Sequence, residues 1–170
     1  AGLKMQELEH NAYSCLHMSD IDINPHQVEA FTFALSTLKS GGAILADEVG
    51  LGKTIEAGLV IKYLLQSGKS KILLIMPSNL RKQWQVELTE KFRVRSLIVD
   101  SSNWKDYLLE IKKKQAVIIV SYNFASKRKT KLSRVVWDFC VFDEAHRLRN
   151  VHKNGSKIAN ALYELTRKIP

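Results

Sequence analysis

The chain has 170 residues, of which 45% are hydrophobic and 25% charged, which is enough apolar material for one globular domain and leaves no room for a second large one. Its formal net charge of +9 favours nucleic acid or another polyanion as a partner, with a merely soluble basic surface as the alternative. Cys15 and Cys140 are far apart and have no second Cys or His at the spacing of a zinc site, so neither a disulfide framework nor a zinc site is expected, and a reducing cytoplasm fits best. No apolar run approaches the roughly 18 residues of a membrane span, so no membrane contact is expected.

Helix-like and strand-like stretches alternate from residue 26 onward, which predicts an α/β fold with a mainly parallel sheet flanked by helices. Each predicted strand is a short apolar run, and each predicted helix has apolar residues at helical spacing. The predicted strands are 43–46, 71–76, 95–99, 116–120 and 139–142, and the predicted helices are 26–39, 55–65, 78–91, 104–113 and 156–168. Ser78 is expected to cap the helix that it starts, and a basic loop is expected at Lys127, Arg128, Lys129 and Lys131.

A glycine-rich loop joins the predicted strand 43–46 to the helix that follows. Its residues are Ala46-Asp47-Glu48-Val49-Gly50-Leu51-Gly52-Lys53-Thr54. In a phosphate-binding loop, glycines let backbone N–H groups converge on phosphate oxygens, and the next helix adds the positive end of its dipole. Lys53 would then reach the β and γ phosphates of ATP, and the Thr54 hydroxyl would bind Mg²⁺. The general pattern G-x-x-x-x-G-K-S/T has glycine where this chain has Asp47, and the alternative is a glycine turn that merely precedes a helix with an exposed lysine.

Two adjacent carboxylates, Asp143 and Glu144, follow the last predicted strand. The carboxyl ends of strands are where open α/β sheets bind their ligands. In a phosphate-loop ATPase, Asp143 would hold Mg²⁺ through water and Glu144 would polarise the water that attacks the γ-phosphate. The alternative is that both carboxylates only favour the dipole of the next helix. The phosphate loop upstream favours the ATPase interpretation.

Several segments, in this order, resemble the motifs of helicase superfamily two, and specifically of the Swi/Snf-type family of DNA translocases. Asp47 is normal in that family's version of motif I. Residues 48–59 are most similar to the bacterial branch that includes the RNA-polymerase-associated recycling ATPase, so a bacterial or archaeal source is expected. The matching segments are 24–27 for the adenine-contacting glutamine, 46–57 for motif I, 75–84 with Glu87 for motif Ia, 119–122 for motif Ib and 142–150, with its Asp-Glu-Ala-His sequence, for motif II.

The resemblance implies a RecA-like lobe that binds ATP and Mg²⁺. Gln27 would contact the adenine, Lys53 and Glu144 would be catalytic, Asp143 would join Thr54 at the metal, and His146 would couple the nucleotide to a second motor lobe. The residues expected around the nucleotide are Gln27, Asp47, Glu48, Val49, Gly50, Leu51, Gly52, Lys53 and Thr54.

The resemblance also implies a surface that contacts nucleic acid. Its candidate residues are Ser78, Arg81, Gln83, Ser121 and Tyr122. Trp84 lies beside them, although a tryptophan on a helix is more often a core residue. The basic residues 127–131 suit salt-sensitive contacts to phosphates, and a solvated run of charge is the alternative.

By the same resemblance, residues 1–20 are an N-terminal extension and residues 21–170 form a first motor lobe that is truncated before the strand bearing motif III. In the family that strand lies between those of motifs I and II. We therefore expect a gap that leads to a rearranged sheet, to outer strands that slide together, or to pairing between copies. The second motor lobe, with the arginine fingers that stabilise transition-state charge, is also expected to be missing, so little or no independent ATP turnover is expected.

The expected function is that of the ATP-binding lobe of an ATP-dependent DNA translocase or helicase-like remodeller, active when joined to its second lobe and bound to DNA. Double-stranded DNA, and RNA polymerase or another DNA-bound protein, are the expected partners. One alternative is a DEAH-type helicase or restriction-enzyme motor subunit, which Asp47 and Leu51 disfavour. Another is a nucleotide-binding or interaction module that never hydrolyses ATP.

Overall fold

The computed structural model of the chain describes residues 23–38, 41–46, 52–113, 115–148, 157–167 and 169. The expected N-terminal extension and residues 47–51 of the phosphate loop lie outside these ranges. The chain divides into two compact units, which we describe separately. The first contains residues 1–68 and 87–94, and the second contains residues 69–86 and 95–170.

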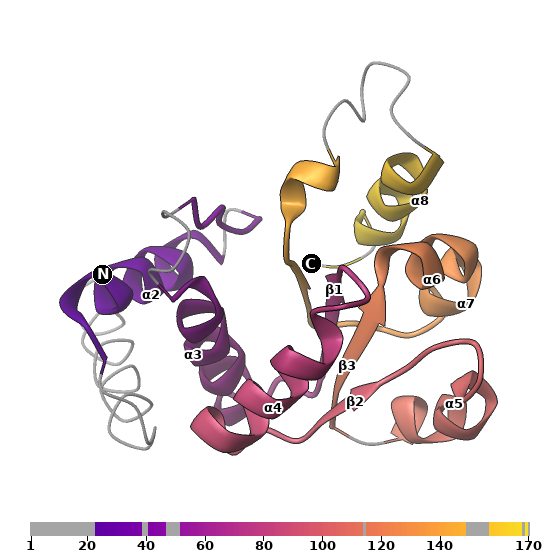
Figure 1. Cartoon of the computed structure of the whole chain (residues 1–170), viewed down its shortest axis with the longest axis horizontal. Coiled ribbons are helices and arrows are strands. Elements are labelled where there is room, and N and C mark those ends of the chain that lie inside the picture. The colour runs from indigo at the N-terminus through magenta and orange to yellow at the C-terminus, as the bar shows by residue number, and fades with distance from the viewer. Residues whose placement is uncertain are drawn as a thin grey trace. The chain divides into compact units, whose positions relative to one another are not determined.

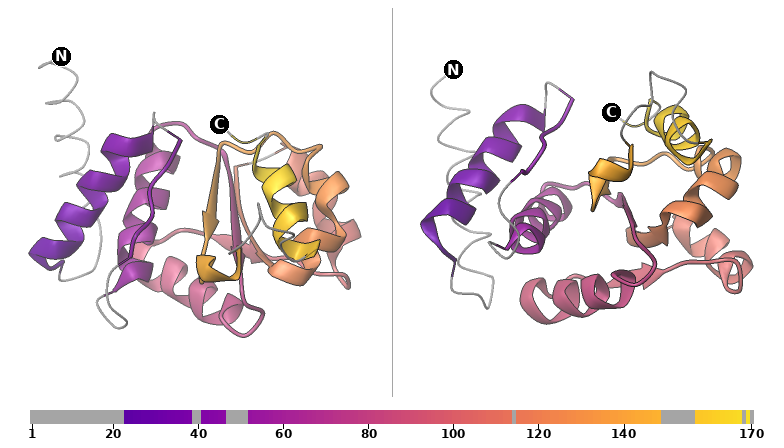
Figure 2. Two further views of the ribbon diagram at one scale, coloured as in Figure 1. Left: turned by 90° about the horizontal axis from the view of Figure 1, so that it is seen from above. Right: turned by 45° about the horizontal axis from the view of Figure 1, so that its top comes forward.

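The first unit is built on two packed helices, α2 (Pro25–Thr37) and α3 (Lys53–Gln66), which lie side by side in Figures 1 and 2. Their apolar faces meet at a buried edge-to-face ring pair, Phe31 and Tyr63, whose centroids are 6.1 Å apart. The end of α4 (Arg81–Phe92) adds Phe92, which packs directly against Gly58 of α3. Both helices predicted here are therefore confirmed, within a few residues at their ends.

The predicted strand 43–46 is wrong. These residues have no regular structure, and the Ile44 side chain is 83% exposed. An apolar run forms a strand only where a neighbour completes its backbone hydrogen bonds, and among the described strands none pairs with this segment.

The expected sliding of outer strands is also wrong, since β4 (Phe139–Phe142), which ends the sheet, pairs with β1 (Lys71–Met76) and with no other described strand. Pairing between copies stays a prediction.

The second unit contains a parallel sheet of four strands in the order β2-β3-β1-β4. Its remaining strands are β2 (Ser96–Ile98) and β3 (Ala116–Ser121). The central strands β1 and β3 are almost wholly buried, as their unbroken apolar runs predict. The register pairs Met76 with Ser121 and Ile75 with Phe142, so β1, β3 and β4 all end at one edge of the sheet. That edge carries the candidate site.

Helices cover one face of this sheet: α5 (Trp104–Lys113), α6 (Tyr122–Lys127), α7 (Lys129–Leu132) and α8 (Lys157–Thr166), drawn in pink, orange and yellow in Figure 1. Leu162 and Leu165 of α8 are buried in the core cluster that this helix shares with α6 and the sheet. The predicted basic loop is wrong, because residues 127–131 belong to α6, α7 and the residue between them. Buried Phe124, Ala125 and Leu132 hold these short helices against the core.

The N-terminus of α4 also differs from the prediction. The helix begins at Arg81, and the carbonyl of Leu80 accepts its first backbone hydrogen bond, from the N–H of Trp84 at 3.0 Å. Residues 78–80 form a turn in which the Leu80 N–H donates to the carbonyl of Pro77 at 3.1 Å. Ser78 therefore does not cap the helix, and its exposed side chain is available at the sheet edge.

Candidate functional site

The N-terminus of α3 in the first unit carries the described part of the phosphate loop. Gly52 precedes the helix with a φ of 94°, and its carbonyl accepts hydrogen bonds from the N–H groups of Ile55 at 2.7 Å and Glu56 at 3.2 Å. Only glycine adopts this left-handed conformation without strain. Lys53 and Thr54 are the first two helical residues and are partly exposed. The positive end of the helix dipole thus lies beside a lysine and a hydroxyl.

Gln27 packs against this glycine from α2. Its side chain is 3% exposed, and its Nε2 atom lies 2.4 Å from the position that a Cβ on Gly52 would occupy. Its Oε1 atom accepts a hydrogen bond from the backbone N–H of Asn24 at 3.1 Å, which closes a capping box at the start of α2. The adenine-contacting candidate and the described end of the phosphate loop are therefore neighbours.

Asp143 follows β4 at the edge of the sheet in the second unit. Its backbone N–H donates to the carbonyl of Ile75 at 3.0 Å. Its Oδ2 atom accepts a hydrogen bond from the indole Nε1–H of Trp84 at 2.8 Å, and its backbone carbonyl accepts one from the Tyr122 hydroxyl at 2.7 Å. Its Oδ1 atom accepts from the backbone N–H of Glu144 at 2.9 Å. Asp143 is thus held by groups from motifs Ia, Ib and II.

Glu144 lies next to Asp143 in a strained conformation. Its φ of 57° falls in the left-handed region, which costs a residue other than glycine about 1–2 kcal/mol. The strand turns here into a short 3-10 helix, Ala145–Leu148. Glu144 and His146 are both exposed, and Glu144 Oε2 lies 3.0 Å from His146 Nδ1. The candidate base and the candidate coupling residue therefore form one solvent-facing pair.

A cavity of about 310 Å³ lies at the carboxyl ends of β1 and β3. It is lined by Pro77, Ser78, Asn79, Ser121, Tyr122, Asn123, Arg147 and Ile158. The guanidinium carbon of Arg147 lies 6.0 Å from the centre of the Tyr122 ring, within range of a cation–π contact. Burial, and next the negative charge of Asp143, raises the pKa of Tyr122 well above its ordinary value, so this hydroxyl remains a neutral donor. The cavity offers hydroxyls, amides and one fixed positive charge, which suits a phosphate group.

The five nucleic-acid candidates divide between this cavity and α4. Ser78, Ser121 and Tyr122 line the cavity, whereas Arg81 and Gln83 are absent from the described lining. The Ser121 hydroxyl also accepts a hydrogen bond from the N–H of Phe124 at 3.2 Å and so caps α6.

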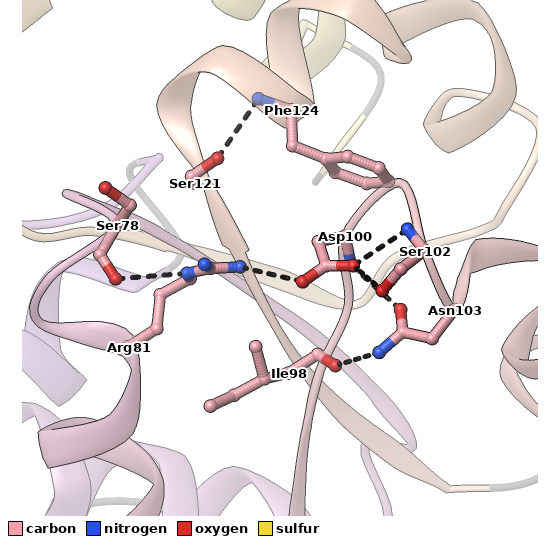
Figure 3. Close-up of polar contacts among 8 residues, drawn as sticks. All are labelled: Ser78, Arg81, Ile98, Asp100, Ser102, Asn103, Ser121 and Phe124. Atoms are coloured by element: carbon pink, nitrogen blue, oxygen red, sulfur yellow. Dashed lines mark hydrogen bonds and ion pairs between the residues drawn. The ribbon is translucent and has the colours of Figure 1, made fainter.

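Arg81 belongs to the second unit and is held by polar contacts within that unit (Figure 3). Its Nε–H donates to the carbonyl of Ser78 at 3.2 Å, and its guanidinium lies 3.8 Å from Oδ2 of Asp100. The Ser102 hydroxyl and backbone N–H, which both donate to Asp100 Oδ1, hold the pKa of that carboxyl below its ordinary value. These contacts give Arg81 a structural role that its motif position does not predict.

Two residues have contacts that the sequence does not predict: Trp84, which the sequence indicated to be a core residue, and Arg147, to which it gave no role of its own. Trp84 is 4% exposed, so the core interpretation is right, but its indole N–H also reaches the Asp143 carboxylate. Arg147 lies within motif II, yet only the fold brings it to the wall that motifs Ia and Ib form. The position of a tryptophan or arginine inside a motif was the only signal in the sequence, and it does not specify the partner.

The residues fit the chemistry of Mg²⁺ and ATP. Mg²⁺ takes few protein ligands and completes its coordination with phosphate oxygens and water. Thr54 offers a hydroxyl, and the Asp143 carboxylate keeps lone pairs beyond its two hydrogen bonds. The described residues contain no cluster of three or more His, Cys, Asp and Glu side chains that could hold a metal ion.

A family model described as the SNF2-related domain matches residues 26–169. The chain belongs to this family. The SNF2-related domain is 34% identical over 153 residues to the RNA polymerase-associated protein RapA of Yersinia enterocolitica, which covers 86% of this chain and 16% of that relative. The chain is thus a Swi/Snf-type helicase-like ATPase domain near RapA, and it spans about a sixth of the length of that relative.

Two solved structures show the same fold as this SNF2-related domain. The Sulfolobus solfataricus SWI2/SNF2 ATPase core in complex with dsDNA superimposes with a TM-score of 0.74 at 27% identity, covering 86% of this chain and 30% of that one. The Sulfolobus solfataricus SWI2/SNF2 ATPase core domain superimposes with a TM-score of 0.67 at 26% identity, covering 89% of this chain and 30% of that one. The RecA-like fold predicted from the motifs is therefore confirmed. No described helix of the domain is both long and apolar enough to cross a membrane.

Proposed function

We propose that this chain is the ATP-binding lobe of a nucleic-acid-stimulated motor, which hydrolyses ATP when it is joined to a second lobe and bound to double-stranded DNA. The observation that carries the proposal is the packing of Gln27 against Gly52 at the N-terminus of α3. It places an amide side chain, a lysine and a hydroxyl around a helix end that attracts phosphate. Membership of the SNF2-related domain family supports the same conclusion.

Each candidate residue has a defined task in this function. Gln27 recognises the adenine, Lys53 contacts the β and γ phosphates, and Thr54 and Asp143 hold Mg²⁺, the latter through water. Bound Mg²⁺ would neutralise charge on the phosphates. Glu144 orients and polarises the attacking water, and its pair with His146 connects it to the surface where a second lobe would act.

The cavity beside Tyr122 is proposed to receive a backbone phosphate of DNA. Arg147 supplies the charge, and Ser78 and Ser121 supply hydroxyls. A structural neighbour was solved in complex with dsDNA, and the relatives are described as RNA polymerase-associated. DNA and RNA polymerase are therefore the partners to test first, and the net charge of +9 suits the former.

Binding of a fluorescent ATP analogue with Mg²⁺ tests the nucleotide site directly. The parent chain should bind the analogue, and Lys53→Ala should abolish this binding. Lys105→Ala is the matched control, because it removes an exposed lysine from α5 and should bind like the parent. If Lys53→Ala bound nucleotide as well as the parent, the site assignment would be wrong.

Hydrolysis distinguishes a motor lobe from a module that only binds nucleotide. The chain alone should release little or no phosphate, and addition of a second lobe and double-stranded DNA should restore turnover. If a protein containing both lobes bound ATP without hydrolysing it on any DNA, the binding module would be the correct function. Stimulation by single-stranded and not double-stranded DNA would favour a strand-separating helicase.

A further inference from the structure

Two side chains from different motifs converge on Asp143. Trp84, in the first turn of α4, donates its indole N–H to the carboxylate oxygen Oδ2 at 2.8 Å. Tyr122, at the start of α6, donates its hydroxyl to the backbone carbonyl at 2.7 Å. One contact restrains the side chain and the other restrains the main chain. Together they restrain both ends of the residue.

Both donors are themselves held in place. Trp84 and Tyr122 are each 4% exposed, and the Tyr122 ring also packs beside Phe142 at 6.3 Å between centroids. An indole N–H can only donate a hydrogen bond, so the Trp84 side chain can hold the carboxylate but cannot accept a hydrogen bond itself. These are properties of groups that orient a ligand residue and do not react themselves.

The contacts also decide which part of the carboxylate remains for a metal. Oδ2 bonds Trp84 on one side, and Oδ1 bonds the backbone N–H of Glu144 at 2.9 Å. An ionised carboxylate has about four lone-pair positions, so about two remain for the water shell of a cation. The same backbone N–H belongs to Glu144, whose φ is 57°, so the orientation of the Asp143 carboxylate depends on the backbone conformation of Glu144.

We propose that Trp84 and Tyr122 are positioning residues, which hold the Asp143 carboxylate in the orientation that binds the Mg²⁺ of the bound nucleotide. The proposal rests on the proposed function, since it assumes that Asp143 serves Mg²⁺. It assigns Trp84 a task beyond packing. It also gives Tyr122 two tasks, because the same ring lines the cavity at the sheet edge. Partners of metal ligands typically change metal affinity by roughly 10- to 100-fold when removed.

The test measures the Mg²⁺ concentration that half-saturates binding of a fluorescent ATP analogue by this chain, and separately the analogue's affinity in EDTA. Trp84→Phe and Tyr122→Phe should each raise the Mg²⁺ midpoint about 10-fold and leave the metal-free affinity unchanged. Tyr122→Phe removes one oxygen atom and keeps the ring, so it remains informative even if Trp84→Phe folds poorly.

Trp137→Phe is the matched control. The Trp137 side chain is 1% exposed and donates its indole N–H to the carbonyl of Leu132 at 2.9 Å, away from Asp143. This variant loses the same kind of bond and should unfold more easily, yet its Mg²⁺ midpoint should equal that of the parent. A role limited to stability would predict parent-like midpoints for all folded variants.

Two further measurements decide the outcome. In an Asp143→Asn background, Trp84→Phe and Tyr122→Phe should shift the Mg²⁺ midpoint no further, because they act through the missing carboxylate. The indole ¹⁵N–¹H resonance of Trp84 should move in Asp143→Asn while that of Trp137 stays. Parent-like midpoints in both folded variants, or equal shifts with and without Asp143, would overturn the inference. If Lys53→Ala nevertheless abolishes nucleotide binding, the proposed function stands; if the parent binds no Mg²⁺-nucleotide, both fail.

Discussion

The side-chain amide of Gln27 occupies the space that a β-carbon on Gly52 would need. The Nε2 atom of Gln27 and this β-carbon would be 2.4 Å apart, and the φ of 94° at Gly52 already disfavours any other residue. We predict that Gly52→Ala displaces Gln27 and abolishes binding of the ATP analogue. The expected loss of binding has two physical reasons: the Gln27 amide is pushed out of its buried position, and the backbone at residue 52 is strained.

Gly68→Ala is the control for this prediction. Gly68 has a φ of 87°, but no atom lies within 4 Å of its hypothetical Cβ. It should lose about 1–2 kcal/mol of unfolding free energy to backbone strain and keep parent-like nucleotide binding. Equal loss of binding in both variants would contradict a specific role for the contact with Gln27.

A second prediction concerns the close approach of Gly58 to Phe92. A Cβ on Gly58 would lie 2.3 Å from the Phe92 ring, whose side chain is 1% exposed. Gly58→Ala should therefore destabilise the chain by about 1–3 kcal/mol in urea unfolding, despite the better helix propensity of alanine. Adding Phe92→Leu should recover part of this loss, because the smaller side chain makes room. If the single variant were more stable than the parent, the packing would be looser than described.

Asp138 should make the stability of the chain depend on acid pH. Burial alone would raise the pKa of Asp138, but hydrogen bonds from the Ser70 N–H at 2.8 Å, the Lys71 N–H at 2.9 Å and the Ser70 hydroxyl, with the charge of Lys69, outweigh it and lower the pKa below its ordinary value. A lowered folded-state pKa stabilises the protein above the unfolded pKa of about 4, and this stability is lost as the pH falls through the folded value.

The variant Asp138→Asn should cost about 2 kcal/mol of unfolding free energy at neutral pH, since hydrogen bonds to a charged acceptor are lost. Its difference from the parent should shrink as the pH falls below about 4. Glu90→Gln changes an exposed carboxylate on α4 and should track the parent throughout. A pH-independent difference for Asp138→Asn would show that charge is not responsible.

Arg147 should contribute one phosphate contact to DNA binding. It is exposed, lines the cavity and lies over the Tyr122 ring. We predict that Arg147→Ala weakens binding to double-stranded DNA of any sequence, and lowers the slope of log affinity against log salt by about one. Lys105→Ala, on α5, should change neither quantity by as much. An unchanged salt slope for Arg147→Ala would move the DNA surface away from the cavity.

Much of the secondary structure follows from local pattern. The apolar runs at 71–76 and 139–142 and the periodic stretch at 104–113 become β1, β4 and α5 with the predicted bounds. These predictions are confirmed because a strand buried on both faces leaves an unbroken apolar run in the sequence, and a helix buried on one face leaves apolar residues at helical spacing. The phosphate-loop and acidic motifs likewise identified the family, since glycine and carboxylate spacing reflects local backbone chemistry.

The two wrong secondary-structure predictions, the strand at 43–46 and the loop at 127–131, have a common cause. Residues 43–46 have a strand-like composition, but composition cannot supply the neighbour that a strand requires. Residues 127–131 look like a solvated charge run, but buried Phe124 and Leu132 on either side turn them into short helices. In both cases packing in the folded chain decided the outcome: none of the described strands pairs with residues 43–46, whereas buried apolar residues beside 127–131 anchor the short helices.

The candidate site shows the same division. The sequence by itself determined which residues are candidates for ATP and Mg²⁺ binding, because motif spacing places Gly52, Lys53, Thr54 and Asp143 at the ends of a helix and a strand. Only the tertiary structure decided that Gln27 meets Gly52, and that Trp84 and Tyr122 meet Asp143. A hydrogen bond depends on distance and direction in three dimensions, and residues 59 positions apart carry no local record of it.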